Sequence, residues 1–108
     1  MTVYIVQEVR GRDISSASKY GNLEILLSAD QKMENYPVKE IQIFRRKLKD
    51  FSDKDFLLLS GDPVAIALAT CIACSYNKGR IKFLRWDRQL EVYFKIGARI
   101  EEEPHERF

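Results

Sequence analysis

The residues best placed for ligand chemistry are Ser60, Gly61 and Asp62, which follow one apolar run and precede another. At a strand-to-helix turn, the first helical amides and the helix dipole favour an anion, so these residues are a candidate nucleotide or phosphate site. The favoured interpretation is structural, because Asp62 is a good N-cap whose own carboxylate would occupy those amides. The segment lacks the glycine-rich loop and the Lys-Ser or Lys-Thr pair of a phosphate-binding loop.

Cys71 and Cys74 have the spacing of a redox or metal-binding pair. Redox pairs lie at helix N-termini, whereas this pair falls late in an apolar segment, where burial raises a thiol pKa. A zinc site needs four ligands, and the chain has two cysteines and one histidine, His105. We therefore interpret both cysteines as packing residues and expect no catalytic residue, metal or cofactor.

Basic residues form two groups, and the second contains aromatic residues. Strands that carry arginine, lysine and aromatic side chains can bind single-stranded nucleic acid by charge and base stacking. Nucleic-acid binding is therefore one hypothesis, weighed against an ordinary solvated face. The residues that would carry it are Arg45, Arg46, Lys47 and Lys49 in the first group, and Arg80 and Lys82 in the second, with Arg85 and Arg88 beyond them.

Arg85, Trp86, Arg88 and Tyr93 form a candidate protein-binding site on a predicted hairpin. Tryptophan, tyrosine and arginine dominate the energetics of protein interfaces, which favours this hypothesis. The alternative is that Trp86 packs at the end of its strand, and the sequence does not separate the two.

The elements that would position these residues are clearest between Asp55 and Tyr76. An apolar run at 56–59 predicts a central strand buried on both faces. Asp62-Pro63 then predicts a helix start, with an N-cap and a proline at the first helical position. The helix predicted over 62–78 has no charged residue from 64 to 76, so we expect it to be buried, and Gly79 suits its C-terminal turn.

Two further strands are predicted over 80–86 and 90–97, as a hairpin. Leu90, Val92, Phe94 and Ile96 alternate with Glu91, Tyr93 and Lys95, the period of a strand buried on one face, and Gly97 is expected to end it or to mark a bulge. Segments 3–9 and 22–27 read as N-terminal strands, with loops over 10–18 and 28–37. Segment 38–51 is expected to start extended and to become an amphipathic helix at about 44–51.

These elements predict an α+β fold: one small mixed sheet of about five strands, packed by the buried helix and the shorter one. With 108 residues, the chain should form a single domain over 1–100, followed by an acidic, flexible tail over 101–108. Apolar runs are too short to cross a membrane, and the N-terminus lacks signal-peptide features. With only two cysteines, a reducing cytoplasm is the expected location.

The order Gly61-Asp62-Pro63, an apolar helix, then Trp86-Asp87-Arg88 and Tyr93 resembles small proteins encoded by tailed phages of cyanobacteria. The resemblance implies expression inside an infected bacterial cell and transfers no catalytic residue. Small phage proteins often act by binding host or phage machinery. The leading hypothesis is therefore a non-enzymatic protein that binds a host or phage protein. A homodimer formed through exposed sheet edges is a further expectation.

Overall fold

The computed structural model describes residues 1–100, so the tail expected at 101–108 lies outside the described residues. The elements follow in the order β1 (Thr2–Gln7), the 3₁₀ helix η1 (Ser15–Tyr20), β2 (Asn22–Leu27), α1 (Val38–Leu48), β3 (Phe56–Leu58), α2 (Pro63–Tyr76), β4 (Arg80–Asp87) and β5 (Val92–Arg99). None of the described helices is long and apolar enough to cross a membrane.

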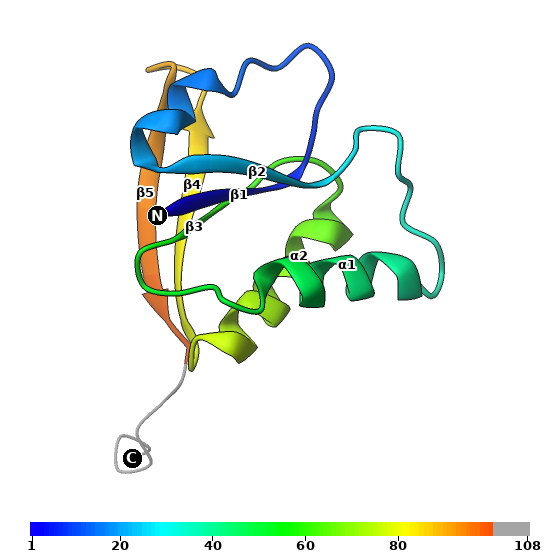
Figure 1. Ribbon diagram of the computed structural model, residues 1–108. Helices are drawn as coiled ribbons and strands as arrows, with labels where there is room; N and C mark the ends of the chain where they lie inside the picture. Colours follow the sequence, from blue (N-terminus) through cyan, green and yellow to red (C-terminus); the bar gives the residue numbers. More distant parts are fainter. Residues whose placement is uncertain (101–108) are drawn as a thin grey trace, which may run out of the picture.

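All five strands form one sheet in the order β2-β1-β3-β4-β5 (Figure 1). The pairs β2–β1, β1–β3 and β3–β4 are parallel, and β5 runs antiparallel to β4. The α+β class, the mixed sheet and the C-terminal hairpin are therefore confirmed.

Each face of the sheet buries its own core. On the helix side, α1 and α2 cover a cluster that includes Tyr4, Val6 and Leu57. On the η1 side, alternate residues of the same strands, Val3, Ile5, Phe56 and Leu58 among them, pack with residues that include Ala17 of η1. Burial on both faces explains why these central strands read as continuous apolar runs.

The connections leave the sheet on opposite faces. The chain passes from β1 to β2 through η1 on one side, and then from β2 to β3 and from β3 to β4 through the helices on the other. Right-handed crossovers require this, because the chain moves in opposite directions along the sheet in the two cases. The carboxyl ends of β1 and β3 are therefore neighbours from which the chain leaves in opposite directions, a position where α/β sheets commonly bind ligands.

Helix α2 begins where the sequence predicts. The Asp62 carboxylate accepts the amide of Val64 at 2.7 Å, and Pro63 is the first helical residue. The helix is less enclosed than its apolar sequence predicts: Ala65, Ala69 and Ala73 are buried, whereas Val64 and Cys71 are exposed. Small alanine side chains bring this stripe close to the sheet, and within residues 1–100 no further layer covers the opposite face of α2.

Helix α1 differs from the prediction, since it is helical from Val38 and ends at Leu48. The amide of Ile41 donates to the carbonyl of Pro37 at 3.0 Å, so the first turn is already formed where an extended start was expected. Its buried residues, Glu40, Phe44 and Leu48, are spaced by four and lie on one helical face. Packing against β2 and α2 selects this periodicity over the strand-like alternation of residues 39–43.

Strand β5 alternates as predicted, but the buried position is Tyr93, which is 5% exposed, whereas Val92, Phe94 and Ile96 are 40%, 36% and 36% exposed. Tyr93 points to the η1 side and packs in its core. The apolar residues of β5 point to the helix side, where the helices pack on β1, β2 and β4 and give β5 no comparable cover. Gly97 lies inside a regular pairing with Lys82, so the expected bulge or strand end is absent there.

Candidate functional site

The helix-side face of the β4–β5 hairpin exposes several large apolar side chains. We call Arg85, Val92, Phe94 and Ile96 the hairpin face. Arg85 is directly opposite Phe94 in the strand register, and Val92 and Ile96 are two residues to either side of Phe94 on β5. An exposed arginine thus lies among three partly exposed apolar side chains, a composition typical of protein interfaces.

The residues predicted from the sequence to bind a protein lie on different faces of the hairpin. Arg85 belongs to the hairpin face, and Arg88 is exposed in the turn that follows β4. Trp86 and Tyr93 point to the η1 side, where their rings meet edge to face with centroids 4.9 Å apart. Trp86 is half-buried and packs against the η1-side core, so these two aromatics support the hairpin from beneath its exposed face.

The hydroxyl of Tyr93 is buried and has no hydrogen-bond partner among the described residues. Burial raises the pKa of this phenol. Because a buried hydroxyl without a partner costs free energy, we expect Tyr93→Phe to leave the free energy of unfolding unchanged or to raise it by up to about 1 kcal/mol. Urea unfolding followed by circular dichroism measures this, and a loss of stability greater than that of Tyr20→Phe would show that the hydroxyl is bonded.

Ser60, Gly61 and Asp62 lie at the junction of the β1 and β3 carboxyl ends, and Gln7 fills that junction. The Gln7 side-chain amide donates to the carbonyls of Ser28 and Gln31 at 3.1 and 2.7 Å, and its oxygen accepts the amide of Asp62 at 2.8 Å. The Ser60 hydroxyl donates to the Gln7 carbonyl at 2.7 Å. The groups proposed to hold a phosphate are therefore already engaged within the chain.

A pocket of about 350 Å³ lies beside this junction, with Gln7, Glu8, Arg10 and Gly61 in its lining. Arg10 forms an exposed ion pair with Asp30. An anionic ligand here would compete with the Glu8 and Asp30 carboxylates for Arg10, and at the helix N-terminus with Asp62. This charge arrangement offers little to a phosphate.

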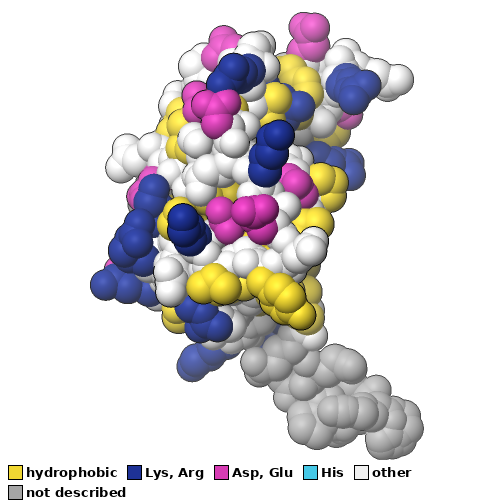
Figure 2. Space-filling view, turned by 90° about the vertical axis from the view of Figure 1, so that its right-hand side faces the viewer, with side chains coloured by type: hydrophobic (Ala, Val, Ile, Leu, Met, Phe, Trp, Pro, Cys, Tyr) yellow, Lys and Arg dark blue, Asp and Glu magenta, His cyan; other side chains and the backbone are white. Residues whose placement is uncertain are grey.

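The structure separates the basic residues: the first group and Arg85 lie on the helix side of the sheet, and Lys82 lies on the η1 side. Arg45, Arg46 and Lys49 are exposed at the end of α1, on the helix side, while the Lys47 ammonium donates to the Ile25 carbonyl at 3.0 Å. Lys82 lies on the η1 side, with its ammonium 4.3 Å from the centre of the Phe56 ring. On the side of the molecule away from β5, lysine and arginine side chains gather along one edge (Figure 2).

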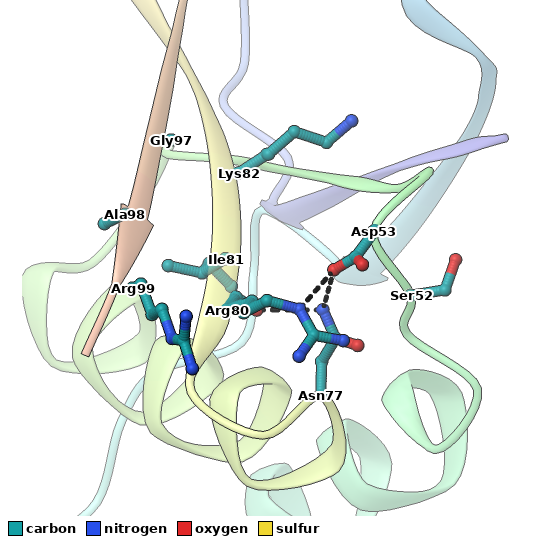
Figure 3. Close-up of a pocket in the computed structure, with 9 residues that line it drawn as sticks. All are labelled: Ser52, Asp53, Asn77, Arg80, Ile81, Lys82, Gly97, Ala98 and Arg99. Carbon is teal, nitrogen blue, oxygen red and sulfur yellow. Dashed lines mark hydrogen bonds and ion pairs between the residues drawn. The ribbon is translucent and has the colours of Figure 1, made fainter. Parts of the chain in front are cut away.

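A second pocket, of about 230 Å³, lies at the start of β4 and the end of β5 (Figure 3). Arg80, Lys82 and Arg99 contribute three cations to its lining, and Asp53 contributes one carboxylate. That carboxylate accepts bonds from Arg80 Nε and Asn77 Nδ2, both at 2.9 Å. Arg80 and Arg99 are directly opposite in the register, so the pocket combines like charges with an excess of positive charge.

Bonds from Arg80, and then from Asn77, lower the pKa of Asp53 below its ordinary value of 3.8. A lowered folded-state pKa stabilises the fold above the unfolded-state pKa, and this contribution disappears as the pH falls through the folded-state value. We expect Asp53→Asn to lower the melting temperature slightly at neutral pH, and this effect to shrink as the pH falls below the ordinary pKa of 3.8. Thermal unfolding across this range tests it, with Asp50→Asn as the control from the same loop; an effect of Asp53→Asn that persists in acid would contradict it.

Cys71 is exposed and Cys74 is partly buried, and both are free thiols. Burial raises the pKa of the Cys74 thiol, and the neighbouring Cys71 adds to this. A raised pKa lowers the thiolate fraction, which is the reactive form. Within residues 1–100, no three histidine, cysteine, aspartate or glutamate side chains are grouped closely enough to hold a metal ion. His105 lies outside the described residues.

A family model described as "Phage Pam3 gp32-like protein" matches residues 1–100. The chain belongs to the Phage Pam3 gp32-like family. This family model spans every described element, including the hairpin and the Gln7 junction. It supports the expected phage family without assigning it to cyanobacterial phages. No curated protein and no solved structure matches the chain.

Sequence reasoning missed two features of this Phage Pam3 gp32-like chain. The strand pattern predicts Gln7 only as a residue of the first strand, although a polar side chain at the end of an apolar strand is a signal of a buried contact. Val92, Phe94 and Ile96 were placed on a half-buried strand without separating its two faces. Tyr93, a large aromatic residue, lies on the other face of the strand from these three residues. The alternation therefore does not show which of the two faces packs against the rest of the protein.

Proposed function

We propose that this phage-family protein acts without catalysis by binding another protein, of the phage or of its bacterial host, through the hairpin face. The observation that carries the proposal is the exposure of Val92, Phe94 and Ile96 on a regular strand that Tyr93 anchors to the core from its opposite face. Adjacent apolar side chains that a fold leaves uncovered commonly mark an interaction site.

The chemistry of the hairpin face favours a protein partner. Phe94 can bury its own aromatic ring in a pocket of the partner. Arg85, directly opposite Phe94 in the strand pair, can donate charge-assisted hydrogen bonds to a carboxylate or carbonyl group of the partner. The strands hold both side chains on a rigid support, so little conformational entropy is lost on binding. From the match to a phage protein family, we expect the encounter in the cytoplasm of an infected bacterial cell.

Affinity capture from infected-cell lysate, treated with nuclease and read by mass spectrometry, tests this proposal. We expect wild type to retain a specific protein and Phe94→Glu to weaken the measured affinity for it by roughly thirtyfold, the loss typical of an interface hot spot. Tyr36→Glu is the matched control, because it adds the same charge at an exposed aromatic residue in the loop before α1. Circular dichroism checks that both variants are folded.

Equal binding by folded Phe94→Glu and wild type would show that the hairpin face is not the contact. Loss of all retained protein after nuclease treatment would instead favour nucleic acid as the direct ligand.

Nucleic-acid binding is the second candidate, supported by the excess positive charge of Arg80, Lys82 and Arg99 around the pocket in Figure 3. Such binding releases counterions from the phosphates, so the affinity for single-stranded DNA or RNA should fall steeply with salt. Fluorescence anisotropy tests this, with Lys82→Gln weakening the binding and Lys95→Gln as a control at an exposed lysine of β5. Affinity that is absent, or that does not depend on salt, excludes this candidate.

A further inference from the structure

Strand β5 forms one edge of the sheet, and its outer side faces no other strand of residues 1–100. It has eight residues, no proline and a regular register with β4. The Ile100 amide donates to the Gly79 carbonyl at 2.7 Å, and hydrogen-bonded positions alternate along an antiparallel pair. The backbone groups of Tyr93, Lys95, Gly97 and Arg99 therefore point away from β4. Long, regular edges of this kind pair readily with another strand.

The opposite edge of the sheet is protected differently. On β2, the Lys47 ammonium occupies the carbonyl of Ile25 at 3.0 Å. A charged side chain on an edge carbonyl blocks the approach of a further strand. The comparable contact on β5 is the Tyr20 hydroxyl, 3.4 Å from the Tyr93 carbonyl, which is long for a bond of this type. The edge at β5 is therefore more accessible to a further strand than the edge at β2.

We propose that β5 pairs with β5 of a second copy of this chain, antiparallel, about a two-fold axis at Ile96. The outward-facing backbone groups then form hydrogen-bonded pairs of Tyr93 with Arg99 of the second copy and of Lys95 with Gly97 of the second copy, each formed twice by symmetry. The two sheets join into one continuous sheet.

Charge selects this register over its neighbours. An axis at Lys95 would place two lysines directly opposite one another, and an axis at Gly97 would place Lys95 opposite Arg99 of the second copy. Like charges directly opposite across a strand pair are destabilising. With the axis at Ile96, each lysine faces a glycine and each arginine faces a tyrosine, so no two cations are directly opposite one another.

The pairing also extends the hairpin face. Ile96 meets Ile96 of the second copy, and Phe94 lies opposite Ala98 of the second copy, all on the helix side. The two hairpin faces then form one apolar strip, with an α2 helix to either side of it. Dimerisation uses the edge of β5 and leaves this strip accessible, so the dimer goes beyond the proposed partner binding and does not depend on it.

Cysteine cross-linking tests both the pairing and its register. In a Cys71→Ser, Cys74→Ser background, we expect oxidised Ile96→Cys to form a covalent dimer, because a non-hydrogen-bonded antiparallel pair brings two Cα atoms to about 4.5 Å, within disulfide range. Phe94→Cys is the matched control, with the same 36% exposure on the same face. Its two copies would lie four residues apart along the strands, roughly 14 Å, and should remain monomeric.

Light scattering of the untagged wild-type protein should give twice the 12.6 kDa mass of one chain. Gly97→Glu, which faces Lys95 of the second copy, should tighten the dimer roughly fivefold, and Gly97→Lys should weaken it by a similar factor. Position 97 accepts a side chain, since an added Cβ would be 4.0 Å from the nearest atom. A wild-type monomer at every concentration, cross-linking of Phe94→Cys equal to that of Ile96→Cys, or equal dimer affinity of the two Gly97 variants would overturn the proposal.

Discussion

Gly61→Ala should destabilise the protein by roughly 3–5 kcal/mol, a large part of the stability of a small domain. Gly61 has a φ of +93°, which side-chain-bearing residues rarely adopt, and an added Cβ would lie 2.4 Å from Gln7 Cβ. Since this neighbour is itself a Cβ next to the backbone of β1, it cannot rotate away. Shortening Gln7 to alanine should therefore not rescue the variant. Urea unfolding monitored by circular dichroism measures the change.

Gly11→Ala separates the two causes of this loss. Gly11 also has a positive φ, +80°, but an added Cβ would meet no atom within 4 Å. Gly11→Ala should therefore lower the free energy of unfolding by the backbone strain alone, about 1–2 kcal/mol. Similar losses for the two variants would mean that close packing against Gln7 contributes nothing to the stability of the junction.

Gln7→Leu should lower the free energy of unfolding by roughly 2–4 kcal/mol, although leucine nearly matches glutamine in volume. The Gln7 side chain is 6% exposed and joins three segments through the Ser28 and Gln31 carbonyls and the Asp62 amide. Leucine leaves all three backbone groups without this partner in a partly buried site, and unsatisfied groups there cost more than the lost bonds alone. Chemical denaturation measured alongside wild type gives the difference.

Gln31→Leu is the control, because the Gln31 side chain accepts a single bond, from the Ser28 amide at 3.2 Å. That bond is exposed, so its loss should cost less than about 1 kcal/mol. A loss for Gln7→Leu no larger than this would show that water replaces the Gln7 contacts without penalty.

The junction also bears on the ligand hypothesis. In open α/β sheets, the carboxyl ends of strands that send the chain to opposite faces flank a crevice that often holds a ligand. In this protein the Gln7 amide lies in that position and bonds the groups that a ligand would use. The Gln7 contacts thus stabilise this sheet at the position where other open α/β sheets bind a ligand. The β4–β5 hairpin, at the far side of the sheet, is more accessible to a partner than this junction.

Local chemistry in the sequence was sufficient for several elements. Asp62 and Pro63 fixed the start of α2, because a cap and a proline act on the amides of their own first turn. The apolar run at 56–59 identified a strand buried on both faces, since no polar residue interrupts it. The alternation of apolar and polar residues after a predicted turn also predicted the C-terminal hairpin correctly.

Other features depended on contacts between residues far apart in the chain. Residues 38–43 fit both a helix and a strand locally, and packing against β2 and α2 made them helical. Gln7 acquired its role only when residues 28–31 and 62 came next to it. The sequence determined that β5 alternates, but the position of the helices decided which of its faces is covered. The physical reason is that periodicity is a property of one strand, whereas burial requires a second element, whose position the strand's own residues do not specify.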